Sequence, residues 1–255
     1  MKTTPILLTG AAHPLGVAAS AVLAAEGYRL RATDTVPLPA DAPAGLVADF
    51  RQGTLTDPEF VAPLLEGAPA IVHLAPLSLV KTMPLDAPEE ILDAAARGTH
   101  VLLKAAIDAG VRMAVQGSTL AVMDAYDDDL EVTEQWRPRP RPDPAEMAPY
   151  LAELTAREFT RDVQLEAPPR IVCLRFGALV DAAAGISEPR ELPVADAAQA
   201  VLRALAALQA GSRQRGHRWQ LYHIAPLAPD ARYTSAAAQQ ALGYGAGAPA
   251  AEVTR

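Results

Sequence analysis

Composition and charge exclude several classes of protein. The chain has 255 residues, half of them hydrophobic, which is enough to bury a large core, and its formal net charge is −8 at pH 7. The arginines are dispersed along the chain, so we expect neither nucleic acid nor an anionic membrane as a partner. Cys173 is the only cysteine, and no run of eighteen apolar residues occurs. We therefore expect a cytoplasmic protein without disulfides or membrane spans.

The N-terminal stretch predicts a strand, a glycine turn and a helix. Residues 6–8 form a short apolar run typical of a buried parallel strand, and the turn TGAAHPLG follows at residues 9–16. Residues 18–26 are rich in helix formers. A helix that begins after such a turn attracts anions through its free N–H groups and its dipole. Residues 28–33 predict a second strand, and Asp34 closes it with a carboxylate suited to a ribose.

Strand and helix signals alternate through the rest of the chain. Further strands are expected at residues 46–48, 70–75, 113–117, 171–175 and 219–224, and further helices at 56–66, 89–109, around 150, 196–210 and 234–242. An irregular loop is expected at residues 76–88, and Asp196 is expected to be a helix N-cap. This order predicts an α/β fold with a Rossmann-type doubly wound parallel sheet. We expect one domain over residues 1–255, to which 176–255 contribute a small substrate lobe.

Several motifs resemble those of one enzyme family. The turn TGAAHPLG, the sequence HLA at 73–75, the GT pair at 98–99, AGVR at 109–112 and LRFG at 174–177 are similar to motifs of the extended short-chain dehydrogenases/reductases, the NAD-dependent epimerases and dehydratases. The resemblance covers nearly the whole chain, and small members such as uronate dehydrogenases are similar in length. It implies a NAD(P)-binding Rossmann domain, NAD as cofactor, and a homodimer that pairs the helix at 89–109 with the tyrosine helix of a second subunit.

The resemblance also implies a set of cofactor-binding residues. They are Gly10, His13, Leu15 and Gly16 in the turn, Asp34 after the second strand, Asp49 and Phe50 after the third, and Leu74 and Ala75 after the fourth. Asp34 favours NAD over NADP, because its carboxylate repels the extra phosphate. Asp49 is interpreted equally well as a surface acid. His13 stands where the family has a glycine against the pyrophosphate, so its imidazole either caps the turn or contacts the pyrophosphate. We expect NAD to bind weakly or not at all.

Two further residues align with the family's catalytic groups. Thr119 aligns with the hydroxyl that contacts the substrate oxygen, or it caps a turn. Tyr150 aligns with the general acid/base, but the lysine expected four residues later is Leu154. A phenol of pKa about 10 is ionised at about one part in a thousand at pH 7, and lowering that pKa to 7 takes about 4 kcal/mol of electrostatic stabilisation. The resemblance places Ser78 against the substrate, and Lys81 is interpreted as a solvated loop residue.

Two functions are compatible with these residues. The first is a NAD-dependent oxidoreductase acting on a small hydroxyl or carbonyl compound, sugar-like or uronate-like, with Tyr150 and Thr119 at the reacting atoms. The second is a catalytically impaired family member that serves as a ligand sensor or as an assembly partner. No metal ligands are predicted. The substitutions at His13 and Leu154 both favour the second hypothesis.

Overall fold

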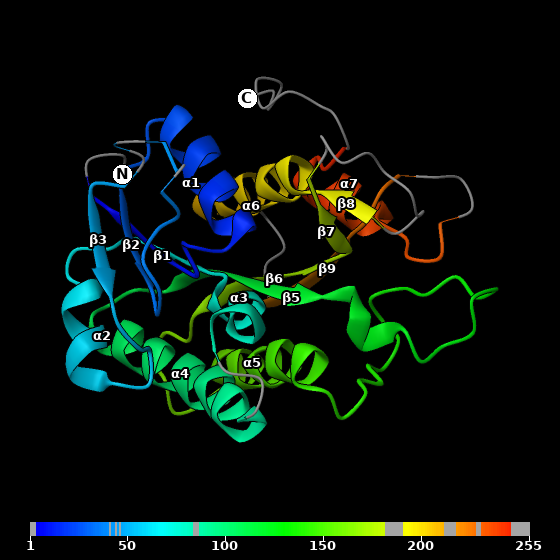
Figure 1. Ribbon diagram of the computed structural model, residues 1–255, viewed down its shortest axis with the longest axis horizontal. Helices are drawn as coiled ribbons and strands as arrows, with labels where there is room; N and C mark the ends of the chain where they lie inside the picture. The colour runs from blue at the N-terminus through cyan, green and yellow to red at the C-terminus, as the bar shows by residue number, and fades with distance from the viewer. Residues whose placement is uncertain are drawn as a thin grey trace.

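The protein is built around a seven-stranded parallel sheet (Figure 1). The computed structural model describes residues 4–40, 42–43, 45, 47–83, 87–181, 191–211, 218–227 and 231–245. The strands of this sheet are β1 (Ile6–Thr9), β2 (Leu30–Asp34), β3 (Asp49–Gln52), β4 (Ile71–His73), β5 (Met113–Thr119), β6 (Arg170–Phe176) and β9 (Trp219–Ile224). Their order is β3-β2-β1-β4-β5-β6-β9, and all neighbours are parallel. The predicted doubly wound Rossmann-type fold is confirmed.

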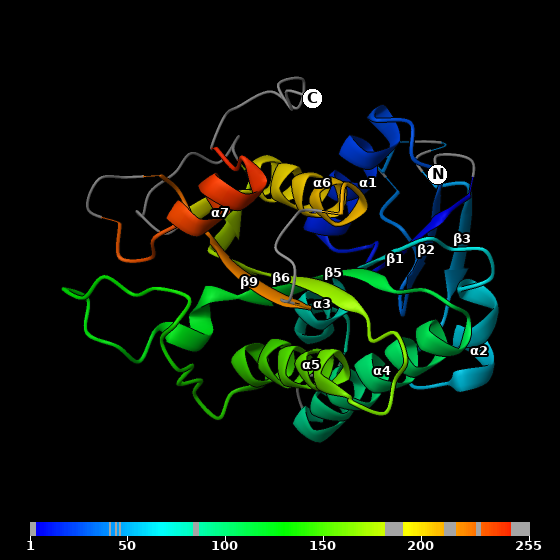
Figure 2. The same cartoon turned by 180° about the vertical axis from the view of Figure 1, so that it is seen from behind.

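Helices cover both faces of this sheet. They are α1 (Pro14–Ala25), α2 (Pro58–Leu64), α3 (Ala75–Thr82), α4 (Pro88–Asp108), α5 (Pro144–Arg161), α6 (Val194–Gln209) and α7 (Ala236–Leu242), with a 3-10 turn η1 (Leu120–Met123). Figure 1 and Figure 2 show α1, α6 and α7 on one face and α2, α4 and α5 on the other. The short strands β7 (Ala178–Val180) and β8 (Glu191–Pro193) pair separately. Among the described residues, no helix combines the length and apolar character required to cross a bilayer.

The apolar run of β1 is explained by burial on both faces of the sheet. Ile6 and Leu8 pack into the apolar cluster formed with α1 and α6, whereas Leu7 packs into the cluster formed with α2 and α4. All three side chains are fully buried. Successive strand residues point to opposite faces, so a strand between two helical layers needs apolar residues at every position.

The glycines of the first turn permit close contacts between backbones. Gly10 has φ +75°, and a Cβ there would lie 2.6 Å from the backbone nitrogen of Ala75. A Cβ on Gly16 would lie 2.1 Å from the carbonyl oxygen of Gly10. These distances are far below van der Waals contact, so α1 can pack this closely against the end of β1 only with glycine at both positions.

Replacing Gly16 by alanine is expected to lower the free energy of unfolding by about 1–3 kcal/mol, because the added methyl group forces α1 away from the turn. Denaturant titration followed by circular dichroism measures this change. The matched control is Gly98→Ala in α4, where the added Cβ would lie 3.3 Å from the Cβ of Leu55. This control gains helix propensity of up to about 1 kcal/mol. Equal stability of Gly16→Ala and the unmodified protein would contradict the prediction.

The third strand was predicted at residues 46–48, but Val47 and Ala48 are not in a strand, and residue 46 lies outside the described residues. Strand β3 runs from Asp49 to Gln52, at the edge of the sheet, with half-buried or exposed side chains. An edge strand carries polar residues because one of its sides faces solvent, so no apolar run marks it in the sequence.

Two further local predictions differ from the structure. The segment expected to be a loop at 76–88 contains α3, with Pro76 in the first turn, where a missing N–H is tolerated. Helix α6 has Pro193 as its N-cap. Asp196 therefore lies within the first helical turn, where its carboxylate interacts favourably with the helix dipole without capping the helix.

Candidate functional site

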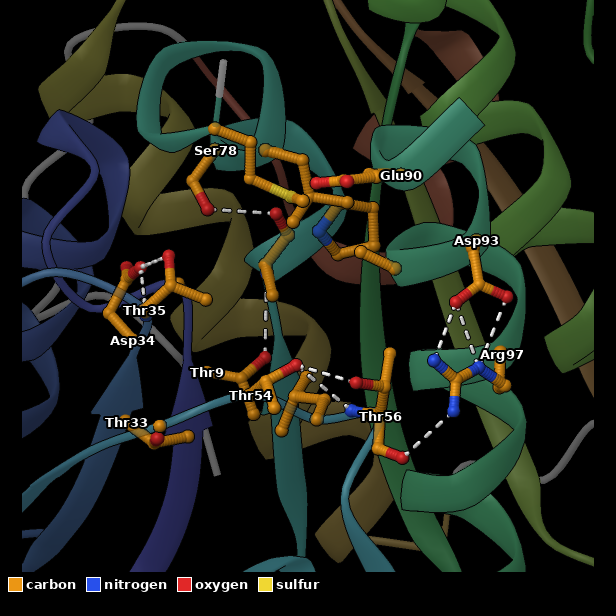
Figure 3. A pocket seen from close by; sticks show the side chains of 18 of the residues that line it. Thr9, Thr33, Asp34, Thr35, Thr54, Thr56, Ser78, Glu90, Asp93 and Arg97 are labelled. Carbon is orange, nitrogen blue, oxygen red and sulfur yellow. Dashed lines mark hydrogen bonds and ion pairs between the residues drawn. The ribbon is translucent and has the colours of Figure 1, made fainter. Parts of the chain in front are cut away.

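A cavity of about 600 Å³ lies at the carboxyl ends of β1, β2 and β4. The strand order reverses between β1 and β4, and open α/β sheets bind ligands at such a point. Figure 3 shows the end of β2 on one side of the cavity and α4 on the other. Of the residues that the sequence assigned to a site, Gly10, Asp34, Ala75 and Ser78 line this cavity.

Asp34 is held in place by the backbone around it. Its Oδ2 accepts a hydrogen bond of 2.9 Å from the N–H of Ala12, and its Oδ1 accepts one of 2.7 Å from the N–H of Thr35. Burial raises the pKa of the Asp34 carboxyl above its ordinary value, and these N–H groups act in the opposite direction. The hydroxyl of Thr35 also donates to Oδ1, at 3.4 Å, and the N–H of Val36 interacts with the same carboxyl, so a ligand hydroxyl would share Asp34 with four donors.

The N-terminus of α1 is capped by a histidine. The Nδ1 of His13 accepts a hydrogen bond of 3.2 Å from the N–H of Leu15. Pro14 occupies the first helical position and has no N–H, and the N–H of Val17 donates to the carbonyl of His13. The first three residues of the helix are Pro14, Leu15 and Gly16. Pro14 has no N–H and the N–H of Leu15 is bonded to the imidazole, so of the three only the N–H of Gly16 remains to bind a phosphate. The imidazole of His13 thus makes the capping contact, and its contact with a pyrophosphate stays a prediction.

The residues around Asp34 and α1 fit a terminal nucleoside of a dinucleotide but not the pyrophosphate at its centre. A pyrophosphate at a helix N-terminus is bound by free N–H groups that point at its oxygens. In α1, Pro14 and the imidazole of His13 remove two of the first three donors. Asp34 remains available for a ribose at the end of β2. The residues present therefore do not fit a bound pyrophosphate, although they fit a nucleoside.

Asp49 and Phe50 lie within β3, not after it, and neither is among the described residues that line the cavity. Asp49 pairs with Arg31 and Phe50 with Ala32 of β2. Both residues are therefore nearer to the amino ends of these parallel strands, whereas the cavity lies at the carboxyl ends. The Asp49 carboxylate forms an ion pair of 3.2 Å with Arg31. The residues that follow β3 and line the cavity are 53–56, a glycine, a leucine and two threonines. This loop after β3 was not predicted, because the strand was expected three residues earlier in the chain.

The residues after β4 form the start of α3. Leu74 is fully buried, and its N–H donates to the carbonyl of Thr9 at 3.0 Å. Ser78 is buried, and its hydroxyl donates to the carbonyl of Ala75 at 2.8 Å within the helix. The oxygen of Ser78 can therefore accept a hydrogen bond from a ligand, while its proton is engaged. The side chain of Lys81 lies outside the described residues.

A chain of buried hydrogen bonds joins Thr9 and His73, which line the cavity, to Thr99. The Nδ1 of His73 is 2.7 Å from the hydroxyl of Thr9, and its Nε2 is 3.0 Å from the hydroxyl of Thr99. These contacts connect β1, β4 and α4. Burial lowers the pKa of His73 to about 3. His73 is thus a neutral, structural histidine at physiological pH.

The free energy of unfolding is expected to fall as the pH decreases below about 6.5, the pKa of histidine in an unfolded chain. Burial lowers the folded-state pKa of His73 and of His223 to about 3. Between these values the unfolded state binds protons that the folded state does not. Each histidine therefore lowers the unfolding free energy by about 1.4 kcal/mol per pH unit, and the full stability is present above pH 6.5. Denaturant titrations at pH 7, 6 and 5 measure the slope.

Imidazole NMR signals provide the control for this prediction. The rings of His73 and His223 should keep the chemical shifts of a neutral imidazole down to about pH 4, as long as the protein remains folded. A titration midpoint between pH 6 and 7 for either ring in the folded protein would contradict the assignment.

The two residues aligned with catalytic groups lie apart from this cavity. Thr119 is the N-cap of η1, and its hydroxyl accepts the N–H of Ala121 at 3.1 Å. Tyr150 is on α5 and packs against an apolar cluster that includes Leu120 and Met123. Neither Thr119 nor Tyr150 is among the described residues that line the cavity. The contact of Thr119 is the one that the capping interpretation expects. Because the hydroxyl oxygen accepts in this contact, its proton can still be donated to another group.

A buried ion pair lies beside Tyr150. Arg175, at the end of β6, donates to the carboxylate of Glu153 on α5 at 2.9 and 2.5 Å. The hydroxyl of Ser118 donates to the same carboxylate at 3.1 Å. Burial disfavours the charge of Arg175, but the hydrogen bond and charge of Glu153 outweigh it and raise the pKa of Arg175, with a smaller contribution from Tyr150. Arg175 thus interacts electrostatically with Tyr150, while Glu153 neutralises its charge.

The comparisons with solved structures establish the fold independently. A mutated uronate dehydrogenase is similar with a TM-score of 0.74 and 20% identity, over 94% of this chain and 80% of that one. A short-chain dehydrogenase/reductase superfamily protein from Agrobacterium tumefaciens with bound NAD gives 0.74 and 20%, over 96% and 93%. A UDP-glucose 4-epimerase gives 0.73 and 19%, over 94% and 92%. At these identities the likeness shows a shared fold.

Sequence comparison identifies the family. No curated protein matches the chain. The model of the NAD dependent epimerase/dehydratase family, however, matches residues 6–181, which include the first turn, the cavity, Thr119 and Tyr150. The resemblance seen in the motifs is therefore confirmed, and the chain belongs to the NAD dependent epimerase/dehydratase family.

Proposed function

We propose that this protein is a ligand-binding member of its family whose dehydrogenase chemistry is strongly impaired. The observation that carries the proposal is the surroundings of Tyr150. One helical turn later the chain has Leu154, and the nearby Arg175 is neutralised by Glu153 at 2.5 Å. A tyrosine acts as a base near neutral pH only when a cation stabilises its phenolate. The capped N-terminus of α1 supports the same proposal, because it weakens the binding of a pyrophosphate.

An oxidoreductase acting on a small hydroxyl or carbonyl compound is the second candidate. It is favoured by Thr119 and Tyr150, which keep the residue types and strand-end or helix positions that the reaction uses in this family. Under this hypothesis Tyr150 exchanges a proton with the substrate oxygen and Thr119 holds that oxygen. The sugar-like or uronate-like substrate, the choice of NAD and the homodimer all belong to this candidate.

A turnover assay separates the two candidates. The purified protein is incubated with millimolar NAD and a panel of uronates and sugars, and NADH formation is followed by absorbance. Family enzymes with normal chemistry would turn over at roughly 1–1000 per second, as enzymes typically do. We expect less than about 0.01 per second. Turnover above about 1 per second that is lost in Tyr150→Phe would establish the oxidoreductase and overturn the proposal.

A further inference from the structure

We propose that the cavity binds a phosphate-free nucleoside, neutral or cationic and carrying an exocyclic amine, in preference to a dinucleotide or a nucleotide. The inference rests on the proposed function, since it names the ligand of the same site. Three observations carry it: the hydrogen-bonding groups of the cavity, the starts of the helices around it, and its charge.

The hydrogen-bonding groups suit a sugar with vicinal hydroxyls. The carboxylate of Asp34 lies at the end of β2 and lines the cavity, where a ligand hydroxyl would share it with the donors already present. Thr33, which precedes it and also lines the cavity, is 1% exposed, and its Oγ1 has no hydrogen-bond partner among the described residues. This Oγ1 is covered by protein atoms, so a ligand in the cavity would reach it only after a local shift of the chain. Asp34 therefore marks the position of a ribose.

The apolar part of the cavity suits a flat base. Leu55, Leu79 and Met83 contribute apolar side chains, and Figure 3 shows Glu90 and Asp93 of α4 across the cavity from Asp34. An exocyclic amine such as that of adenine is a hydrogen-bond donor, and carboxylates are its natural acceptors. The volume of about 600 Å³ falls within the range of pockets that hold ligands of this size.

Each of the three helices that begin near the cavity is unable to bind phosphate well. Helix α1 loses its donors to Pro14 and His13. Helix α3 has Pro76 in its first turn, and Pro76 lines the cavity. Helix α4 carries Glu89 and Glu90 in its first turn, and both line the cavity. Prolines remove N–H donors, and carboxylates repel an anion from the positive end of a helix.

The charge of the cavity excludes anions further. Its described lining carries four carboxylates, Asp34, Glu89, Glu90 and Asp93, against the single guanidinium of Arg97, which is three negative charges in excess. Arg97 itself is engaged by Asp93 at 2.6 Å. A phosphate entering this field meets like charge, whereas a neutral or cationic nucleoside does not.

Calorimetric titration of the full-length protein at fixed ionic strength tests the inference. The probes are adenosine, inosine, AMP and NAD. We expect adenosine to bind at least tenfold more tightly than AMP or NAD, and more tightly than inosine, which has a carbonyl in place of the amine. Tighter binding of AMP or NAD than of adenosine would overturn the inference, and so would the absence of adenosine binding at millimolar concentration.

Two variants assign the selectivity to named residues. His13→Gly with Pro14→Ala returns N–H donors to α1 and should increase the affinity for AMP and NAD at least tenfold, with adenosine unchanged within about twofold. Asp34→Asn should weaken adenosine binding at least tenfold. The matched control, Asp49→Asn, changes a carboxylate that lies outside the cavity and should leave all four affinities unchanged. If the double variant fails to gain affinity for AMP, the inference is wrong.

This experiment and the turnover assay fail independently. Tight binding of NAD without turnover would overturn the inference and leave the proposed function standing. Rapid, Tyr150-dependent turnover would overturn the proposed function, and the order of the four ligand affinities would still be measured by calorimetry.

Discussion

Replacing Arg175 by methionine is expected to lower the free energy of unfolding by about 3–5 kcal/mol, because it leaves the carboxylate of Glu153 buried without its cation. Arg175 is 1% exposed and Glu153 is 4% exposed, so solvent cannot stabilise either charge once its partner is gone. The hydroxyl of Ser118 donates one hydrogen bond to Glu153, which is insufficient to replace a bidentate guanidinium. Denaturant titration with a constant m-value measures the loss.

The double variant separates the ion pair from simple packing. In Arg175→Met with Glu153→Met, no charge remains buried, so most of the lost stability should return. Lys104→Met is the surface control. Lys104 pairs with Asp108 at 2.6 Å, but both side chains are more than half exposed, so the expected change is less than about 1 kcal/mol. A double variant that is as unstable as Arg175→Met alone would show that volume, rather than charge, accounts for the effect.

Introducing a lysine beside Tyr150 is expected to raise dehydrogenase turnover with NAD about a hundredfold. The variant combines Leu154→Lys with His13→Gly and Pro14→Ala. Leu154 is half-buried and lies one helical turn from Tyr150 on the same face, so an ammonium group there can stabilise the phenolate. The two changes in the turn return donors for the pyrophosphate. A cation that lowers the pKa of a phenol by about two units raises its ionised fraction at pH 7 by about two powers of ten.

Matched variants identify the source of any gain. Leu154→Met in the same background keeps the side chain apolar and should give no increase. Adding Tyr150→Phe should remove the increase completely, because it deletes the group that exchanges the proton. The turnover of the lysine variant should also rise with pH along a curve with an apparent pKa below 10. An unmodified protein that is already fast, together with a slower lysine variant, would refute the account of Tyr150.

Much of the fold could be predicted from the sequence because its central strands are short apolar runs separated by glycine turns and amphipathic helices. The run at 6–8 and the helix that follows are specified by residues within twenty positions of one another. Strand β3 and helix α3 were missed for a physical reason. An edge strand has no apolar run, and a helix with Pro76 in its first turn resembles a loop.

The residues of the cavity that could be predicted are those at or after the end of a correctly predicted strand. Gly10 and Asp34 lie at the ends of predicted strands, and both line the cavity. Asp49 was expected after the third strand, but it is the first residue of β3 and does not line the cavity, because the strand was predicted three residues too early. The pair of Arg175 and Glu153 joins β6 to α5, and no spacing in the sequence reveals such a tertiary contact. The homodimer and the roles of Thr119 and Tyr150 stay predictions.

The packing of α1 on α6 has a consequence for folding. These helices lie side by side on one face of the sheet, although Pro14 and Val194 are separated by about 180 positions. Closing so long a loop is entropically slow, and folds dominated by such distant contacts assemble in milliseconds to seconds. Because the ribosome makes α6 late, the side of α1 that packs against α6 stays exposed during synthesis until α6 has been made.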